Sequence, residues 1–174
     1  SGGRFEVQIP RNGSRFISSD GSGSLATGSA SIASDVPLGA AAILSVFDTQ
    51  GRFQTEAGIG NSPLLTAFTL PVEVNGNLDT GVALFNPGST PASIGVRLLD
   101  AGGNVVNTTS LLLAARSHIA PFVTQLFPGT PNLRGTLAVN ASAAVAALAL
   151  RQNANPLFYT TLPVTAGSAR GRTP

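Results

Sequence analysis

The clearest alternation of apolar and polar positions runs from Gly135 to Val164. Leu137 and Val139 alternate with smaller or more polar residues, which predicts a strand with one dry face. Ala144–Leu150 is apolar at every position, and its short length and polar borders favour a strand buried on both faces, although alanine itself favours helix. Leu157–Val164 is rich in aromatic and β-branched residues and predicts a third strand.

Shorter apolar runs separated by Gly, Pro, Asn and Asp predict further strands in the rest of the chain. In the first half these are Phe5–Ile9, Arg15–Ile17, Leu25–Ala33, Leu38–Phe47, Arg52–Ala57 and Leu64–Val74. In the second half they are Gly81–Asn86, Ala92–Asp100, Asn104–Leu113 and Ser117–Phe122, followed by a helical turn at Thr124–Phe127. The turn sequences at 48–51 and 100–104 predict two hairpins.

A weak internal repeat relates the two halves. Gly23–Ala26 resembles Gly135–Ala138, Leu38–Leu44 resembles Ala144–Leu150, and the matches keep the same order along the chain. We therefore expect an all-β fold, an antiparallel β-sandwich made of two related Ig-like or sandwich units, in tandem or merged into one domain. The expected first unit, residues 1–75, lacks two strands of the second, residues 76–166, and residues 167–174 form a tail or linker.

Composition narrows the function classes. Charged residues are only 10% of the 174 residues, the net charge is +2, and there is no Lys/Arg stripe, so we expect no nucleic-acid binding. No apolar run is long enough to span a bilayer, so we expect no membrane insertion. The chain has no Cys, which excludes disulfides, thiolate metal sites and cysteine nucleophiles. It also has no Met, so we expect a processed product, a fragment or one module of a longer protein, exported by a bacterium.

The second half contains TGVALFNP, RLLDAGGNVV, SHIAPFVTQLFP, RGTLAV, AALALRQN and FYTTLPV. This series resembles an uncharacterised module that recurs, often in tandem, in secreted and cell-surface proteins of bacteria. The resemblance covers about 80–164 well and 5–59 loosely. It implies a β-sandwich in an extracellular setting, and it carries no catalytic or ligand site to this chain.

Candidate catalytic and metal-binding residues are few. His118 is the single histidine and has no carboxylate at metal-ligand spacing, so packing or surface exposure is the favoured role. Glu56 lies within a predicted strand, and an ion pair with Arg151 is favoured over a catalytic acid. Asp20 and Asp79 lie in polar loops but lack the alternating acidic ligands of a calcium loop. We therefore expect no catalytic residue, no cofactor and no metal.

Two binding hypotheses remain. The first is a non-enzymatic structural or adhesive module of a bacterial surface protein, which self-associates or binds neighbouring surface domains. It could be the subunit of a pilus-like fibre that uses strand complementation, with Phe5, Val7 and Ile9, or the 166–174 tail, as the exchanged strand. The alternative is a carbohydrate-binding module, with Phe158 and Tyr159 as glycan contacts.

Overall fold

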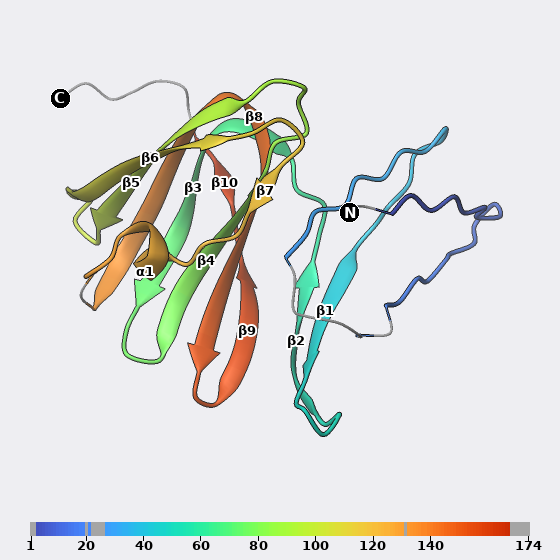
Figure 1. Cartoon of the computed structure of the whole chain (residues 1–174), viewed down its shortest axis with the longest axis horizontal. Coiled ribbons are helices and arrows are strands. Elements are labelled where there is room, and N and C mark those ends of the chain that lie inside the picture. The colour runs from blue at the N-terminus through green and yellow to red at the C-terminus, as the bar shows by residue number, and fades with distance from the viewer. Residues whose placement is uncertain (1–2, 20, 22–26, 131, 168–174) are drawn as a thin grey trace.

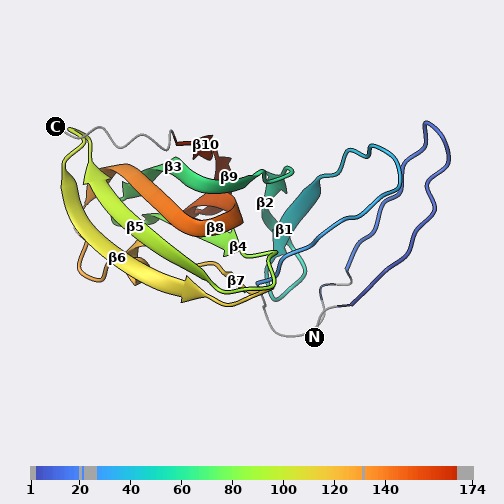
Figure 2. The same cartoon turned by 90° about the horizontal axis from the view of Figure 1, so that it is seen from above.

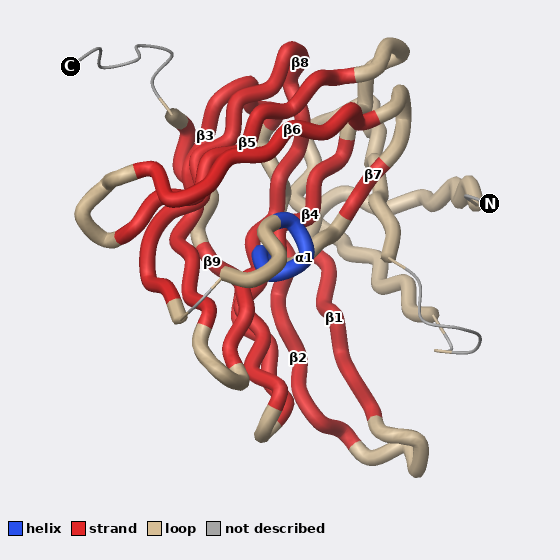
Figure 3. The backbone as a smooth tube through the Cα atoms, turned by 60° about the vertical axis from the view of Figure 1, so that its left-hand side comes forward, coloured by secondary structure: helices blue, strands red, loops and turns tan. Residues whose placement is uncertain are grey.

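The computed structural model of the chain describes residues 3–19, 21, 27–130 and 132–167 (Figure 1). The fold is all-β, an antiparallel β-sandwich, as predicted. The strands are β1 (Ala42–Phe47), β2 (Phe53–Ile59), β3 (Leu64–Val74), β4 (Leu78–Phe85), β5 (Ala92–Asp100), β6 (Val105–Leu113), β7 (His118–Ile119), β8 (Leu133–Ala154), β9 (Leu157–Leu162) and β10 (Thr165–Ala166). One helical turn, α1 (Val123–Leu126), contacts β4 and β3 (Figure 3).

The 22-residue strand β8 connects the two layers of the sandwich. Its first part, Leu133–Ala141, lies between β3 and β5, and β6 continues this layer beyond β5. Its last part, Ala146–Ala154, lies between β4 and β9, and β7 pairs with the other edge of β4. Every pairing is antiparallel. Because β8 pairs with strands of both layers, it connects the layers covalently.

A sharp bend in β8 makes this double membership possible. The pairing with β3 changes register between Leu65 and Ala67: Leu65 pairs with Val145, whereas Ala67 pairs with Asn140. At the bend, the hydroxyl of Ser142 accepts a hydrogen bond from the Ser93 backbone N–H at 2.9 Å. The side chain thus supplies an acceptor for a β5 N–H at the end of the ladder between β5 and β8, which is typical of a bulge.

The core lies between the layers and is filled by alternate residues of each strand. Buried side chains come from both parts of β8, from β3, β4 and β5, from α1 and from the residue that follows α1: Phe68, Leu70, Val72, Val82, Leu84, Ile94, Val96, Leu98, Val123, Phe127, Leu137, Val139 and Val145. The period of two is the one read from the sequence. The hydrophobic alternation therefore encoded which face of each strand is dry.

Several predicted strands are confirmed. The hairpin at 48–51 appears as β1 and β2, the hairpin at 100–104 appears as β5 and β6, and the helical turn is α1. The predicted strand Leu64–Val74 is β3. The boundary predicted at residue 75 falls in the tight turn between β3 and β4, where Asn75 and Leu78 exchange backbone hydrogen bonds.

Other strand predictions are wrong. The strand predicted around Leu137 and Val139 and the strand predicted at Ala144–Leu150 are parts of one continuous strand. The polar residues between them, Asn140 and Ser142, are exposed to solvent and do not end the strand. Its second part is dry on one face only: Val145, Ala147 and Ala149 are buried, while the intervening residues are at least partly exposed. The predicted strand Ser117–Phe122 shrinks to the two residues of β7.

The N-terminal arm, which we define as the described residues between 3 and 40, contains no strand. The strands predicted at Phe5–Ile9 and Arg15–Ile17 have no regular secondary structure, nor do residues 27–33, and 25–26 lie outside the described residues. A strand needs backbone partners, and the arm runs outside the sandwich beside the β1–β2 hairpin (Figure 2). Alternating sequence alone was therefore not sufficient to form strands here.

Candidate functional site: exposed strand edges and the grooves beside them

The β1–β2 hairpin has an open edge. Within the described residues β1 pairs only with β2, so one side of its backbone is free. Its sequence, AILSVF, contains no charge and no proline, which are the usual devices that block pairing at an edge. Ile43 is 62% exposed and Phe47 is 57% exposed. The strand thus offers both free backbone groups and apolar side chains to a partner.

The hairpin is attached to the sandwich through β9. Thr55 and Ala57 of β2 are buried, and β2 contacts β9. The Thr55 hydroxyl accepts a hydrogen bond from the Tyr159 N–H at 3.2 Å, and the described part of the chain shows no strand pairing between β2 and β9. At the other end of the hairpin, Phe47 and Phe53 pack edge to face with ring centroids 5.9 Å apart. Both rings remain more than half exposed.

The N-terminal arm exposes further apolar side chains. Those more than about half exposed are Phe5, Phe16, Ile17, Ile32 and Val36. One tether to the sandwich is a hydrogen bond between Nε2 of His118 and the carbonyl oxygen of Thr27, at 2.9 Å. An extended segment with this many uncovered apolar residues is typical of an interaction surface.

A second open edge belongs to β6. This nine-residue strand pairs with β5 and, within the described residues, with no other strand. It too carries neither charge nor proline, and Val105, Val106 and Leu112 are at least half exposed. Beside its start lies the β6 groove, a hollow of about 150 Å³ lined by Leu98, Val106, Asn107, Pro128, Gly129, Thr130 and Leu133.

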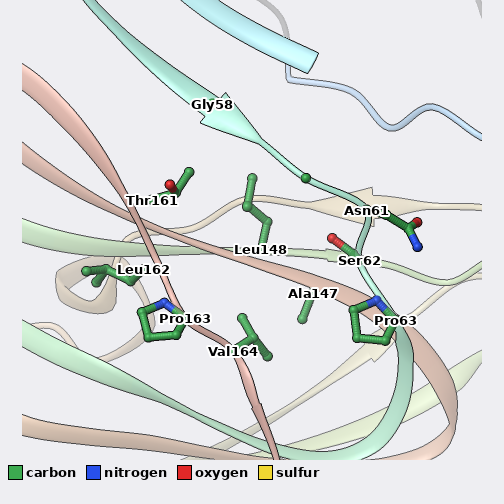
Figure 4. A pocket seen from close by; sticks show the side chains of 11 residues that line it. Gly58, Asn61, Ser62, Pro63, Ala147, Leu148, Thr161, Leu162, Pro163 and Val164 are labelled. Carbon is green, nitrogen blue, oxygen red and sulfur yellow. The ribbon is translucent and has the colours of Figure 1, made fainter. Parts of the chain in front are cut away.

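A larger, open groove of about 330 Å³ lies between the β2–β3 loop and the strands β8 and β9. We call it the β9 groove. Figure 4 shows Ser62 and Pro63 on one side of it and Leu162, Pro163 and Val164 on the other, with Leu148 of β8 between them. None of the described residues that line it is aromatic or charged.

The predicted glycan contacts lie near this groove without lining it. Phe158 and Tyr159 are both partly buried on β9. The guanidinium of Arg151 lies over the Phe158 ring, 5.9 Å from its centroid, and covers one face of it. The two residues are adjacent on a strand and therefore project to opposite faces, so they do not form a shared aromatic platform.

The predicted strand-exchange residues are exposed but unpaired. Phe5 is 76% exposed, Val7 is 46% exposed, and Ile9 is partly buried. None of the three lies in a strand, so strand exchange through them stays a prediction. Ala166, the first residue of the 166–174 tail, pairs with Phe68 of the same chain in β10, and Thr165 before it pairs with Thr69. Residues 168–174 lie outside the described residues.

The predicted ion pair between Glu56 and Arg151 is wrong. Arg151 binds Glu73 at 2.8 Å, because the bend of β8 brings its last part back beside β3. Arg134 binds the same carboxylate at 2.9 Å. Glu56 is exposed on β2, where its carboxylate accepts a hydrogen bond from the Ser45 hydroxyl at 3.4 Å. The sequence did not predict this network of ion pairs, because its residues are far apart along the chain.

The candidate metal-binding residues are dispersed. Among the described residues no three His, Cys, Asp or Glu side chains come together as a cation site. Oδ2 of Asp79 accepts a hydrogen bond from the Thr124 hydroxyl of α1, and Oδ1 of Asp79 is buried without a hydrogen-bond partner. Asp20, the other calcium candidate, lies outside the described residues.

Two turn carboxylates have shifted pKa values. The backbone N–H and side chain of Arg52 lower the pKa of Asp48, and the side chain and backbone N–H of Asn104 lower the pKa of Asp100. Each carboxylate accepts hydrogen bonds inside its own hairpin turn, which stabilises the ionised form. These groups organise turns and do not face a groove.

No family model and no curated protein matches the chain. A structure described as the crystal structure of Thermotoga maritima 1070 is similar over 60% of this chain and 97% of that one, with a TM-score of 0.49 and 13% sequence identity. Within the described ranges, no helix is long and apolar enough to cross a bilayer.

Proposed function

We propose that this chain is a non-enzymatic structural module that assembles with other copies of itself, at the surface of a bacterial cell or outside it. The proposal is carried by one observation: the β1–β2 hairpin and the N-terminal arm expose apolar side chains beside an open strand edge. Water is a poor environment for such a surface, and pairing with another chain removes both the apolar area and the free backbone groups from it.

The exposed area is large enough for a stable contact. Phe5, Phe16, Phe47 and Phe53 are each more than half exposed. Covering four such rings would bury about 500 Å² from one copy, since a phenylalanine buries about 150–250 Å². A standard interface takes about 800 Å² per partner, and further exposed apolar side chains of the arm and the hairpin, Ile17, Ile32, Val36 and Ile43, would add to this area.

The extracellular setting is supported by composition. A chain with 10% charged residues and no Cys or Met has little to be oxidised outside a cell. The non-enzymatic assignment is supported by the dispersal of the carboxylates: Asp48 and Asp100 serve turns, and Glu73 is bound by two arginines. Carbohydrate binding has less support, because the β9 groove has no aromatic lining residue among the described ones and Arg151 covers one face of Phe158.

The test is the assembly state of the full chain as a function of concentration, measured by sedimentation velocity and negative-stain electron microscopy. We expect oligomers or filaments that Ile43→Lys weakens by at least about tenfold, because a buried, unpaired charge costs more than 1.4 kcal/mol. The matched control is Thr49→Lys, which adds the same charge in the exposed turn of the same hairpin. A chain that remains monomeric at about 100 μM, a concentration at which weak specific contacts form, would overturn the proposal.

A further inference from the structure

We infer that β1 of one copy adds to the open edge of β6 in the next copy, antiparallel to it, with Phe47 entering the β6 groove. The inference rests on the proposed self-assembly and names its interface. It joins two features that the chain leaves uncovered within its described residues: a donor strand with an exposed aromatic ring at its end, and an acceptor edge with an empty hollow at its start.

The two edges belong to different parts of the fold and have different neighbours. One layer ends in β6 after β5, and the other continues from β9 to the β1–β2 hairpin. The start of β6, beside the β6 groove, therefore lies far from the hairpin (Figure 2). A contact between two different surfaces of the same molecule is heterologous, and it generates a ring or an open filament instead of a closed two-fold dimer.

The side chains match in one antiparallel register. Alternation along β6 turns Thr109 and Leu111 toward the core layer, where both are only partly buried, and among the described residues no further strand pairs with this edge. Setting Ser45 opposite Thr109 places Ile43 opposite Leu111. Phe47, which follows the register shift of the β1–β2 ladder after Val46, then lies near Asn107. Ile43 then covers a partly buried leucine, and two hydroxyl side chains face each other. Pairs of this kind stabilise antiparallel strands.

The β6 groove fits the end of this strand. It is lined by Val106 and Asn107 from the start of β6, and by Leu98 and Leu133 from the neighbouring strands. Its volume of about 150 Å³ equals that of an apolar protein cavity known to accept benzene, so a phenyl ring is the expected guest. In the register above, Phe47 arrives beside Asn107 at its rim. An aromatic side chain in a central pocket is the usual energetic anchor of an interface.

The charges of the two strands also agree with direct pairing. Neither AILSVF nor VVNTTSLLL contains an ionisable residue, so the two strands that pair bring no charge of their own to be desolvated. The nearest charge is Glu56 on β2, whose carboxylate accepts a hydrogen bond from the Ser45 hydroxyl. Pairing of two β1 strands, or of two β6 strands, would satisfy one kind of edge and leave the other uncovered. The β1–β6 contact covers both kinds in every copy.

Because the chain has no cysteine, single cysteines report the contact directly. The experiment mixes Ser45→Cys protein with Thr109→Cys protein carrying a mass tag, oxidises mildly, and separates the products on a non-reducing gel. Antiparallel neighbours lie at a separation that a disulfide can bridge. We expect mixed dimers to form at least about tenfold faster than with the control pair Thr49→Cys and Thr109→Cys, since assembly raises the effective concentration of the thiols.

The outcomes separate this inference from the proposed function. Predominant Ser45→Cys homodimers would show β1–β1 pairing, and predominant Thr109→Cys homodimers would show β6–β6 pairing; either overturns the inference. Normal assembly with cross-linking no faster than the control overturns the interface and leaves self-assembly standing, whereas a monomeric chain overturns both. Should either cysteine disturb folding, Leu44→Cys with Ser110→Cys tests the same register on the opposite face.

Discussion

Glu73 of β3 and Arg151 of β8 form an ion pair at 2.8 Å, although 78 residues separate them in the sequence. The same carboxylate binds Arg134, which begins the strand that Arg151 nearly ends. A straight strand would hold these two arginines about 56 Å apart, at about 3.3 Å per residue. One carboxylate that binds both therefore fixes the bend by which β8 passes from one layer of the sandwich to the other.

Glu73→Gln should destabilise the sandwich by about 1–3 kcal/mol. The carboxylate is 15% exposed and the Arg151 side chain is 34% exposed, so the loss leaves a partly desolvated guanidinium without its counter-charge. Urea denaturation followed by circular dichroism measures the effect. Glu56→Gln is the control, because it removes an exposed strand carboxylate and should change the free energy of unfolding by less than about 0.5 kcal/mol. Equal effects of the two substitutions would contradict the stabilising role of the Glu73 ion pairs.

Asn86→Ala should cost about 3 kcal/mol or more. The Asn86 side chain is fully buried, donates to the carbonyl oxygens of Thr90, Leu113 and Ala114, and accepts from the Gly88 N–H. Truncation leaves several buried backbone groups unsatisfied. The midpoint of urea unfolding measures this loss of stability. Asn61→Ala, in the exposed β2–β3 loop, is the matched control substitution. A loss below about 1 kcal/mol would mean that water replaces the amide.

Gly135→Ala should prevent or severely weaken folding, by more than about 4 kcal/mol. A Cβ at this position would lie 1.9 Å from the backbone carbonyl oxygen of Leu99 on the neighbouring strand, and backbone cannot move aside as a flexible side chain can. Gly95→Ala, on β5, is the control, since its Cβ would meet only the Asn140 oxygen at 3.9 Å. We expect Gly95→Ala to leave stability unchanged or to raise it by up to about 1 kcal/mol, as measured by thermal unfolding.

Stability should fall as the pH drops below about 4, partly because of Asp48 and Asp100. Their pKa values in the folded chain lie below the ordinary value of 3.8, so their contribution is fully present above that value and is lost as the pH falls through the folded pKa values. The urea midpoint measured from pH 6 to pH 3 tests this. Asp100→Asn should reduce the pH dependence.

Asp35→Asn is the control for the pH series. Asp35 lies in an exposed bend, and its carboxylate takes part in none of the hydrogen bonds that the structure describes. A pH dependence that Asp35→Asn and Asp100→Asn reduce equally would show that general charge, and not the Asn104 contacts of the β5–β6 turn, sets the acid sensitivity.

Strand exchange through the N-terminal segment stays a prediction, and the structure has open strand edges elsewhere in the fold. Missing strands in the first half predicted an open edge, with Phe5, Val7 and Ile9 as the exchanged segment. The structure has open edges at β1 and β6, and the arm that contains Phe5 forms no strand. The uncharged sequence of β6 was a usable signal, but whether a strand lies at an edge depends on which strands flank it. Pairing across the fold decides that, and a local pattern does not contain it.

By itself the sequence determined the elements that local physics controls. Period-two alternation set the dry faces of β3 and β5, and the turn sequences at 48–51 and 100–104 set two hairpins, because side-chain direction and turn geometry are local properties. Only the tertiary structure decided that residues 133–154 form one bent strand, that Glu73 and not Glu56 binds Arg151, and that the arm stays unpaired. Each of these depends on groups far apart in the chain, whose contacts exist only once the layers have packed.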